Sequence, residues 1–261
     1  AGNLSITGGT TTLSAINTYA GTTTIATGAT ILIDGGGKLG NGSYAGAIAN
    51  AGTLDYDSTA TQTLSGIISG AGALTVTGSG TGALTLTGVN TYSGATTIAT
   101  GSLVIGGSGK LGNGSYAGTI ANATTLTYSS DATQTLSGVI SGAGAVVKDT
   151  DASVLTLSGN NTFTGDLTVN LGTVDVTGTL AANVDVVVAN AAAIYKVSAS
   201  DTINTLTVGA AGKAQLESGQ TLTIAATSAI AGVVQGAGNL SITGGTTTLS
   251  AINTYAGTTT I

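Results

Sequence analysis

The sequence predicts an all-β fold in which the chain winds as a right-handed parallel β-helix, a solenoid of roughly 18–24 residues per coil. Three observations lead to the parallel solenoid. The chain repeats itself at fixed spacings, its short apolar segments alternate with threonine, and it lacks proline altogether. Each is taken in turn below, and the handedness rests on a resemblance that follows them.

The chain contains two levels of repetition. Residues 1–25 return letter for letter as residues 237–261, which defines a tandem period that runs from position 1 to position 236. Within that period, internal units start near positions 17, 90 and 161, and the motif Lys38–Gly46 recurs as Lys110–Gly118. Tandem repeats of this kind are typical of solenoids, whose units pack mainly on their neighbours. We therefore expect residues 1–261 to form one continuous β-helix segment, taken from a longer array of nearly identical periods.

Short segments with a two-residue period predict the strands. In the segment 73–78, Leu74 and Val76 fall on one face and the threonines on the other; Leu84 and Leu86 repeat the pattern in 83–88. This alternation is typical of half-buried strands. Parallel coils bury such faces by stacking like residues, at about 4.8 Å per coil, or about 50–60 Å per period. Further expected strands are 96–98, 103–105, 124–128, 135–136, 154–157, 167–169, 174–176, 184–188, 194–197, 205–208, 222–224 and 240–242.

Composition supports a stack of many small layers and excludes several functions. Charged residues make up 6% of the chain, against about 25% in ordinary soluble domains. The absence of proline suits strands that are paired on both sides. Eleven acidic residues against five lysines or arginines argue against a nucleic-acid groove. No apolar run approaches the length of about 18 residues that a membrane-spanning helix needs.

Two residue types recur in register and mark the expected corners of the coil. The asparagines are interpreted as turn residues whose side chains hydrogen-bond backbone groups that a tight corner leaves unpaired. The aromatic residues two positions later are expected to cover or fill a corner; the alternative is that both types contact glycans. These structural turn positions are Asn17, Asn90, Asn161, Asn253, Tyr19, Tyr92, Phe163 and Tyr255.

The same residues form a pattern that resembles a known family. The stretch Leu84–Ile98, with its Leu-x-Leu-x-Gly-x-Asn-x-Tyr-x-Gly signature and the following Gly101–Ile105, is similar to the autotransporter-associated β-strand repeat. The signature also lies at Leu13–Ile33 and, in weaker form, at Leu155–Val176. That repeat occurs in passenger regions of Gram-negative autotransporters and related giant adhesins. The resemblance implies a right-handed β-helix at the cell surface or outside the cell of a Gram-negative-like bacterium.

Candidate chemical motifs have simpler structural readings. Gly35–Gly40 and Gly107–Gly112 match G-x-G-x-x-G, but no helix start follows them, so we expect turns rather than a dinucleotide site. The close carboxylate pairs are Asp55 with Asp57 and Asp149 with Asp151. Such pairs serve glycoside hydrolysis in other proteins. The chain contains no histidine, and Asp55 and Asp57 are not preserved between repeats. We therefore expect solvated acids, no enzyme activity, no cofactor and no bound metal.

These observations predict a structural role. The expected function is a segment of a long extracellular bacterial fibre or adhesin stalk, whose partners are neighbouring copies of the same repeat in one chain. Lateral self-association into bundles is a further expectation. The alternative is a passenger domain that binds a glycan or a cell surface, and an exposed row of aromatic or acidic residues on one face would favour it. A polysaccharide lyase or hydrolase is a third hypothesis and needs a groove with clustered acids and a base.

Overall fold

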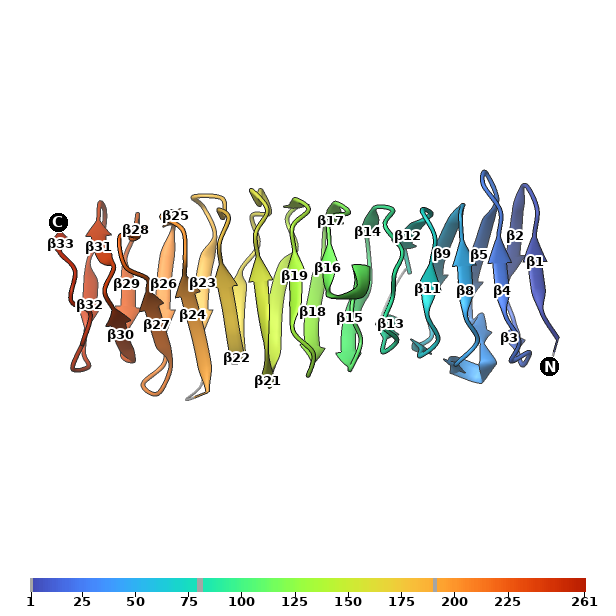
Figure 1. The fold of residues 1–261 in the computed structure, drawn as a ribbon, viewed down its shortest axis with the longest axis horizontal. Coiled ribbons are helices and arrows are strands. Elements are labelled where there is room, and N and C mark those ends of the chain that lie inside the picture. The colour runs from blue at the N-terminus through green and yellow to red at the C-terminus, as the bar shows by residue number, and fades with distance from the viewer. Residues whose placement is uncertain (1, 79–81, 190–191) are drawn as a thin grey trace. The chain divides into compact units, whose positions relative to one another are not determined.

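The computed structural model confirms the all-β, parallel solenoid. It describes residues 2–78, 82–189 and 192–261, and the side chains of residues 151 and 152 lie outside this description. The described residues make about 12 turns of stacked parallel strands. By its internal contacts it divides into two compact units, residues 1–134 and 135–261. Within each unit, Figure 1 shows the strands of successive coils lying side by side.

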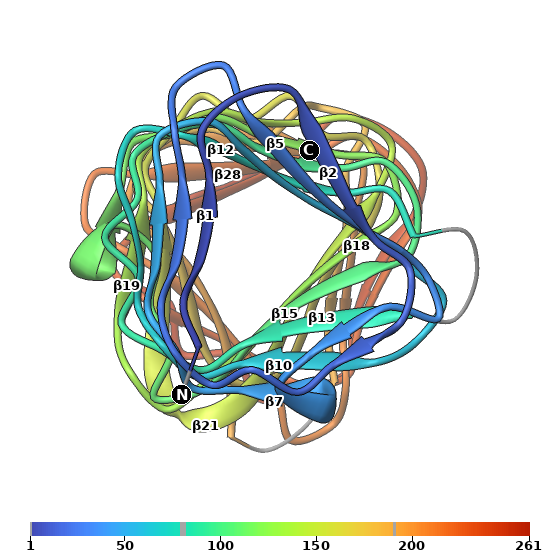
Figure 2. The same cartoon turned by 90° about the vertical axis from the view of Figure 1, so that its right-hand side faces the viewer.

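The first unit builds three sheets from strands that repeat along the coils (Figures 1 and 2). Its first sheet contains β1 (Leu4–Ile6), β4 (Thr23–Ile25), β8 (Ile48–Asn50) and β11 (Ile68–Ser69). The second contains β2 (Thr10–Leu13), β5 (Thr30–Gly35), β9 (Thr53–Ser58), β12 (Ala73–Val76), β14 (Thr96–Ile98) and β17 (Ile120–Asn122). The third contains β7 (Ser43–Tyr44), β10 (Gln62–Leu64), β13 (Ala83–Leu86), β15 (Ser102–Gly107) and β18 (Thr125–Ser130).

Short elements occupy the corners of this unit. They are β3 (Ile16–Asn17), β6 (Lys38–Leu39), β16 (Ser115–Tyr116) and the 3₁₀ turns η1 (Gly40–Gly42) and η2 (Gly112–Gly114), while β19 (Gln134–Leu136) lies at the division. Asn41 and Asn113 sit at the centres of the two turns with φ of 56° and 55°, a left-handed conformation that asparagine tolerates better than most residues. The G-x-G-x-x-G motifs therefore lead into tight turns.

The second unit follows the same plan and begins with the short strand β20 (Ile140–Ser141). One set of paired strands is β21 (Ala145–Leu157), β22 (Leu167–Val176), β23 (Asp185–Val188), β26 (Thr205–Val208), β29 (Ser228–Ile230) and β32 (Thr247–Leu249). A second set, which pairs with the end of β22, is β24 (Ala193–Val197), β27 (Lys213–Leu216) and β30 (Val233–Gly236). The third is β25 (Asp201–Ile203), β28 (Thr221–Ile224), β31 (Asn239–Ile242) and β33 (Thr259–Thr260).

Among the described strand registers, coil lengths agree with the sequence prediction at all but one step. The shortest step in the strand registers, from Thr221 to Asn239, lies at the lower end of the predicted range. The longest, from Thr23 to Ile48, passes just beyond its upper end, because η1 and β7 are inserted into that coil. A coil that can absorb a few extra residues at a corner keeps its strands in register without a strict sequence period.

Aliphatic side chains stack inside the coils, as the alternation predicts. Leu74, Val76, Leu84 and Leu86 are all fully buried, while the intervening threonines are half-buried. Burying such a side chain contributes roughly 1.5–3 kcal/mol each. Because every coil adds a similar layer, the core continues along each unit without any single large cluster.

From one internal repeat to the next, the chain completes three coils and then continues to the next sheet, so equivalent residues lie on different faces of the coil. In the first repeat β4 lies in the first sheet, whereas its sequence equivalent in the second repeat, β14, lies in the second sheet. The internal repeat therefore does not contain a whole number of coils. Figure 2 shows the consequence: η1, in blue, and η2, in green, protrude at different corners of the first unit.

Candidate functional site

The recurring asparagines join three successive coils. The Oδ1 atom of Asn90 accepts a hydrogen bond from the Ile68 backbone N–H at 2.9 Å, one coil earlier. Its Nδ2 group donates to the carbonyl oxygens of Gly88 at 2.9 Å and of Lys110, one coil later, at 3.1 Å. Asn161 makes the matching three contacts with Ile140, Gly159 and Thr179 at 3.0, 2.9 and 3.2 Å. Each amide thus satisfies backbone groups on both sides of its own corner.

The other two asparagines make subsets of these contacts. Asn17 donates to Ala15 at 2.7 Å and to Lys38, one coil later, at 3.3 Å. Asn253 donates to Ala251 at 3.0 Å and accepts from Val234, one coil earlier, at 2.7 Å. Since residues 17 and 253 occupy identical positions in the two copies of the repeated segment, the two subsets together reproduce the full set seen at Asn90.

Two tyrosines and a threonine form a cluster at one corner of each close repeat. The Thr96 hydroxyl lies 2.8 Å from the hydroxyls of both Tyr92 and Tyr116, which come from successive coils. The Tyr116 hydroxyl also donates to the carbonyl oxygen of Gly94. Both rings are buried, and burial raises the pKa of each phenol. Neither ring offers a free face on which a sugar can stack.

The first repeat contains the same cluster. Thr23 lies 2.8 Å from the Tyr19 hydroxyl and 2.7 Å from the Tyr44 hydroxyl, and the Tyr19 and Tyr44 ring centres are 5.4 Å apart. Burial raises the pKa of Tyr19 to about 12. Tyr44 and Tyr116 were not singled out by the sequence analysis, although their recurrence within the Lys-Leu-Gly-Asn-Gly-Ser-Tyr motif is the signal that identifies them.

The third repeat and the last coil contain variants of the cluster. Phe163 stands where the other repeats have tyrosine, and Leu167 stands where they have threonine. Both are fully buried. The third repeat therefore lacks both hydroxyls of the pair, so neither of these two described residues leaves a hydroxyl without its hydrogen-bond partner. In the last coil the Tyr255 and Thr259 hydroxyls are 2.5 Å apart.

Buried glutamines cap other corners and were missed from the sequence. Gln62 Oε1 accepts from the Leu39 N–H at 2.8 Å, and its Nε2 group donates to the Leu39 carbonyl at 3.1 Å. Gln134 makes the same pair of bonds with Leu111. The two glutamines recur in the two close repeats, but each partner lies one coil earlier in the chain, so the contact is visible once the coil length is known.

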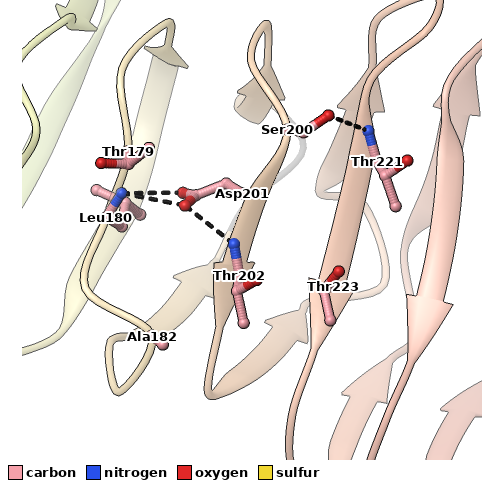
Figure 3. A pocket seen from close by; sticks show the side chains of 8 residues that line it. All are labelled: Thr179, Leu180, Ala182, Ser200, Asp201, Thr202, Thr221 and Thr223. Carbon is pink, nitrogen blue, oxygen red and sulfur yellow. Dashed lines mark hydrogen bonds between the residues drawn. The ribbon is translucent and has the colours of Figure 1, made fainter.

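A polar hollow in the second unit surrounds Asp201 (Figure 3). The hollow measures about 340 Å³, and its lining residues are Thr179, Leu180, Ala182, Ser200, Asp201, Thr202, Thr221 and Thr223. The Asp201 residue is 7% exposed. Its two carboxylate oxygens accept hydrogen bonds from the Leu180 N–H at 3.2 and 3.1 Å, and one also accepts from the Thr202 N–H at 3.0 Å.

At Asp201 a carboxylate makes a contact with a backbone N–H that neutral asparagine side chains make elsewhere in the chain. Like Asn90 and Asn161, it accepts the backbone N–H of a residue one coil earlier. Burial raises the pKa of its carboxyl to about 6, and the hydrogen bonds from Leu180 and Thr202 oppose that shift. Sequence reasoning did not identify Asp201, because nothing in its local sequence distinguishes it from a solvated acid.

The hollow offers hydroxyls and a single carboxylate. Asp201 is the one ionisable group among the described residues that line it. Glycoside hydrolysis by the usual route needs two carboxylates on either side of the bond, and the lining does not bring a second one to Asp201. The arrangement can hold a small polar molecule by hydrogen bonding, but it does not supply a matched acid and base.

The carboxylate pairs singled out in the sequence lie elsewhere. Asp55 accepts from the Thr77 hydroxyl at 2.8 Å, and burial raises the pKa of its carboxyl, with Asp57 adding to the shift. The strand register places Asp34 beside Asp57. Asp149 accepts from Asn170 at 3.1 Å, while the Asp151 side chain lies outside the described part.

Three stretches match the family model described as the passenger-associated-transport-repeat, namely residues 5–33, 74–105 and 149–176. They include the whole of each segment on which the resemblance to autotransporter passenger repeats was based, so that resemblance is confirmed. Together with the fold, the matches show that the chain is similar to repeat regions of the passenger-domain type. No curated protein and no solved structure matches the chain. A search of the described residues for a helix with the length and hydropathy of a membrane span finds none.

Proposed function

We propose that this chain is a structural, non-enzymatic segment of a long fibre or adhesin stalk on or outside a Gram-negative-like bacterial cell. The observation that carries the proposal is the set of contacts at Asn90 and Asn161, each of which ties one coil to both its neighbours. A coil held in this way pairs with the coil before it and presents a hydrogen-bonding edge to the coil after it. The function is to set distance and to resist unfolding.

The outer surface supports the stalk more than a ligand-binding passenger domain. An exposed row of aromatic or acidic residues along one side would favour a ligand-binding function. The corner tyrosines of the two close repeats are largely covered, with Tyr92 fully buried and Tyr44 at 1% exposure. Because the repeat advances by one face, equivalent surface residues of the first unit also point to different sides. This spacing distributes surface features around the coil and opposes a single adhesive stripe.

Electron microscopy of the native material tests the stalk. We expect a thin filament with an axial repeat of about 50–60 Å, from roughly eleven coils of about 4.8 Å. Irregular globular particles without that repeat would contradict the proposal. The alternative, a glycan- or cell-binding passenger domain, is tested by applying the purified chain to a glycan array, where saturable binding by the isolated chain decides for it.

A further inference from the structure

The two identical segments, residues 1–25 and 237–261, are paired on opposite sides. In the first copy, β2 pairs with β5 and β4 pairs with β8, so these partners lie after the segment. The pairing of β1 with β4 lies inside the segment, as does the pairing of β31 with β33 in the second copy. In the second copy, β31 pairs with β28 and β32 pairs with β29, so those partners come earlier. Residues 240–242 and 247–249 repeat residues 4–6 and 11–13, and both copies form strands there. The same sequence is therefore seen paired with the following coil in the first copy and paired with the preceding coil in the second.

The first copy shows which residues cover the side that is open in the second. Tyr44, one coil later, bonds to Thr23, donates to the carbonyl of Gly21 and packs against Tyr19. The corresponding residues 255, 257 and 259 lie in the last coil, where Tyr255 and Thr259 already bond to each other. Ile16, over which the coil of residues 26–50 lies, is 55% exposed, whereas its copy Ile252 is 87% exposed.

We propose that the open side of residues 237–261 is a docking surface for a coil with the sequence of residues 26–50, supplied by a second copy of this period. Tyr44 of that copy completes the cluster of Tyr255, Thr259 and the Gly257 carbonyl. The carbonyl of its Ala47 accepts the Thr259 N–H, as Ala47 accepts from Thr23 at 2.9 Å within the chain. The inference rests on the proposed stalk function and names the contact that joins successive periods.

Glycine restricts which coils can dock on this surface. A Cβ atom on Gly46 would lie 2.2 Å from the Gly21 carbonyl oxygen, which no side chain tolerates. The same closeness exists one coil earlier in both copies: a Cβ on Gly21 would lie 2.3 Å from the Gly2 carbonyl oxygen, and one on Gly257 would lie 2.1 Å from that of Gly238. A coil that docks on Gly257 must therefore place glycine at that point and a hydroxyl donor two residues earlier. Gly46 and Tyr44 meet both requirements.

The test extends the full chain by a second copy of residues 26–50 at its C-terminal end. Amide hydrogen exchange is followed at Thr259, and the Tyr255 ring is followed by NMR. We expect exchange at Thr259 to slow by about a hundredfold or more on extension, as for a strand amide that becomes paired. Extensions that carry Tyr44→Ala or Gly46→Ala in the added copy should lose most of that protection.

A scrambled extension of the same composition is the matched control. If the native extension leaves Thr259 as exchangeable as in the original chain, or if the scrambled extension protects it equally, the docking surface is refuted. The proposed function fails separately, because it depends on filaments in micrographs of the native material. Protection without filaments would overturn the stalk and leave the docking surface intact.

Discussion

Tyr92 and Tyr116, which lie on successive coils, meet edge to face with ring centres 5.4 Å apart, and both hydroxyls lie 2.8 Å from that of Thr96. Edge-to-face packing of aromatic rings contributes about 0.5–1.5 kcal/mol beyond the burial of area. The shared hydroxyl fixes the axial order of the three side chains. A corner whose other residues are small thus gains a specific contact between neighbouring coils.

Removing one hydroxyl from this cluster should destabilise the chain. Tyr116→Phe keeps the ring but loses the bonds to Thr96 and to the Gly94 carbonyl, which remain buried. We expect the free energy of unfolding to fall by about 1–2 kcal/mol, measured by urea denaturation. Tyr255→Phe, in the half-buried terminal copy, is the matched control and should change it by less than about 0.5 kcal/mol. Equal effects at both positions would show that the shared hydroxyl contributes no specific stability.

Glycine at the close contacts between coils should be irreplaceable. In Gly46→Ala the new methyl group would lie 2.2 Å from the Gly21 carbonyl oxygen and 2.5 Å from the Tyr44 ring. Overpacking of this kind typically costs about 1–3 kcal/mol. Gly36→Ala is the control, because nothing lies within 4 Å of its Cβ position. Thermal unfolding should show a lower Tm for Gly46→Ala alone, and an unchanged Tm in both variants would contradict the close approach.

The corner asparagines should differ in importance according to the number of coils they join. Asn90→Ala leaves the buried Ile68 N–H and the Lys110 carbonyl without the amide that satisfies them. A buried group left unpaired costs about 1–3 kcal/mol. Asn17→Ala removes the same residue from a copy whose amide bonds only to its own and the following coil, so we expect a smaller loss. Denaturant titration of the two variants compares them directly, and a larger loss at Asn17 would contradict this account.

The strands and corners were accessible from the sequence because their signals are local. Leu84 and Leu86 alternate with threonine, and Asn90 follows Gly88 by two positions at the predicted turn, so period and turn chemistry suffice. The rotation of the repeat by one face was not accessible, since it depends on coil lengths that differ from one coil to the next. The capping roles of Gln62 and Asp201 could not be predicted for the same reason. Each partner lies one coil away, and the local sequence does not reveal which residue that is.

Asp201 should make the stability of the second unit depend on pH. Its pKa in the folded chain is raised from 3.8 to about 6, so the folded state favours the protonated carboxyl. The stability that this protonation provides is present below pH 3.8 and is lost as the pH rises through about 6. At about 1.4 kcal/mol per pKa unit, the loss between pH 4 and pH 7 is of the order of 2–3 kcal/mol. The nearby Tyr195 phenol has a pKa well above its usual value, because of burial and the Asp201 charge, and does not titrate in this range.

Asp201→Asn removes that titration and keeps an acceptor for the Leu180 N–H, as Asn161 does for Ile140. We expect the variant to be more stable than the parent chain at pH 7, with the advantage shrinking toward pH 4. The measurement is the free energy of unfolding from urea titrations at half-unit pH steps. Asp131→Asn, which removes the same charge from an exposed position, controls for net charge. A constant difference between the parent and Asp201→Asn across the range would show that the buried carboxylate carries no linkage to folding.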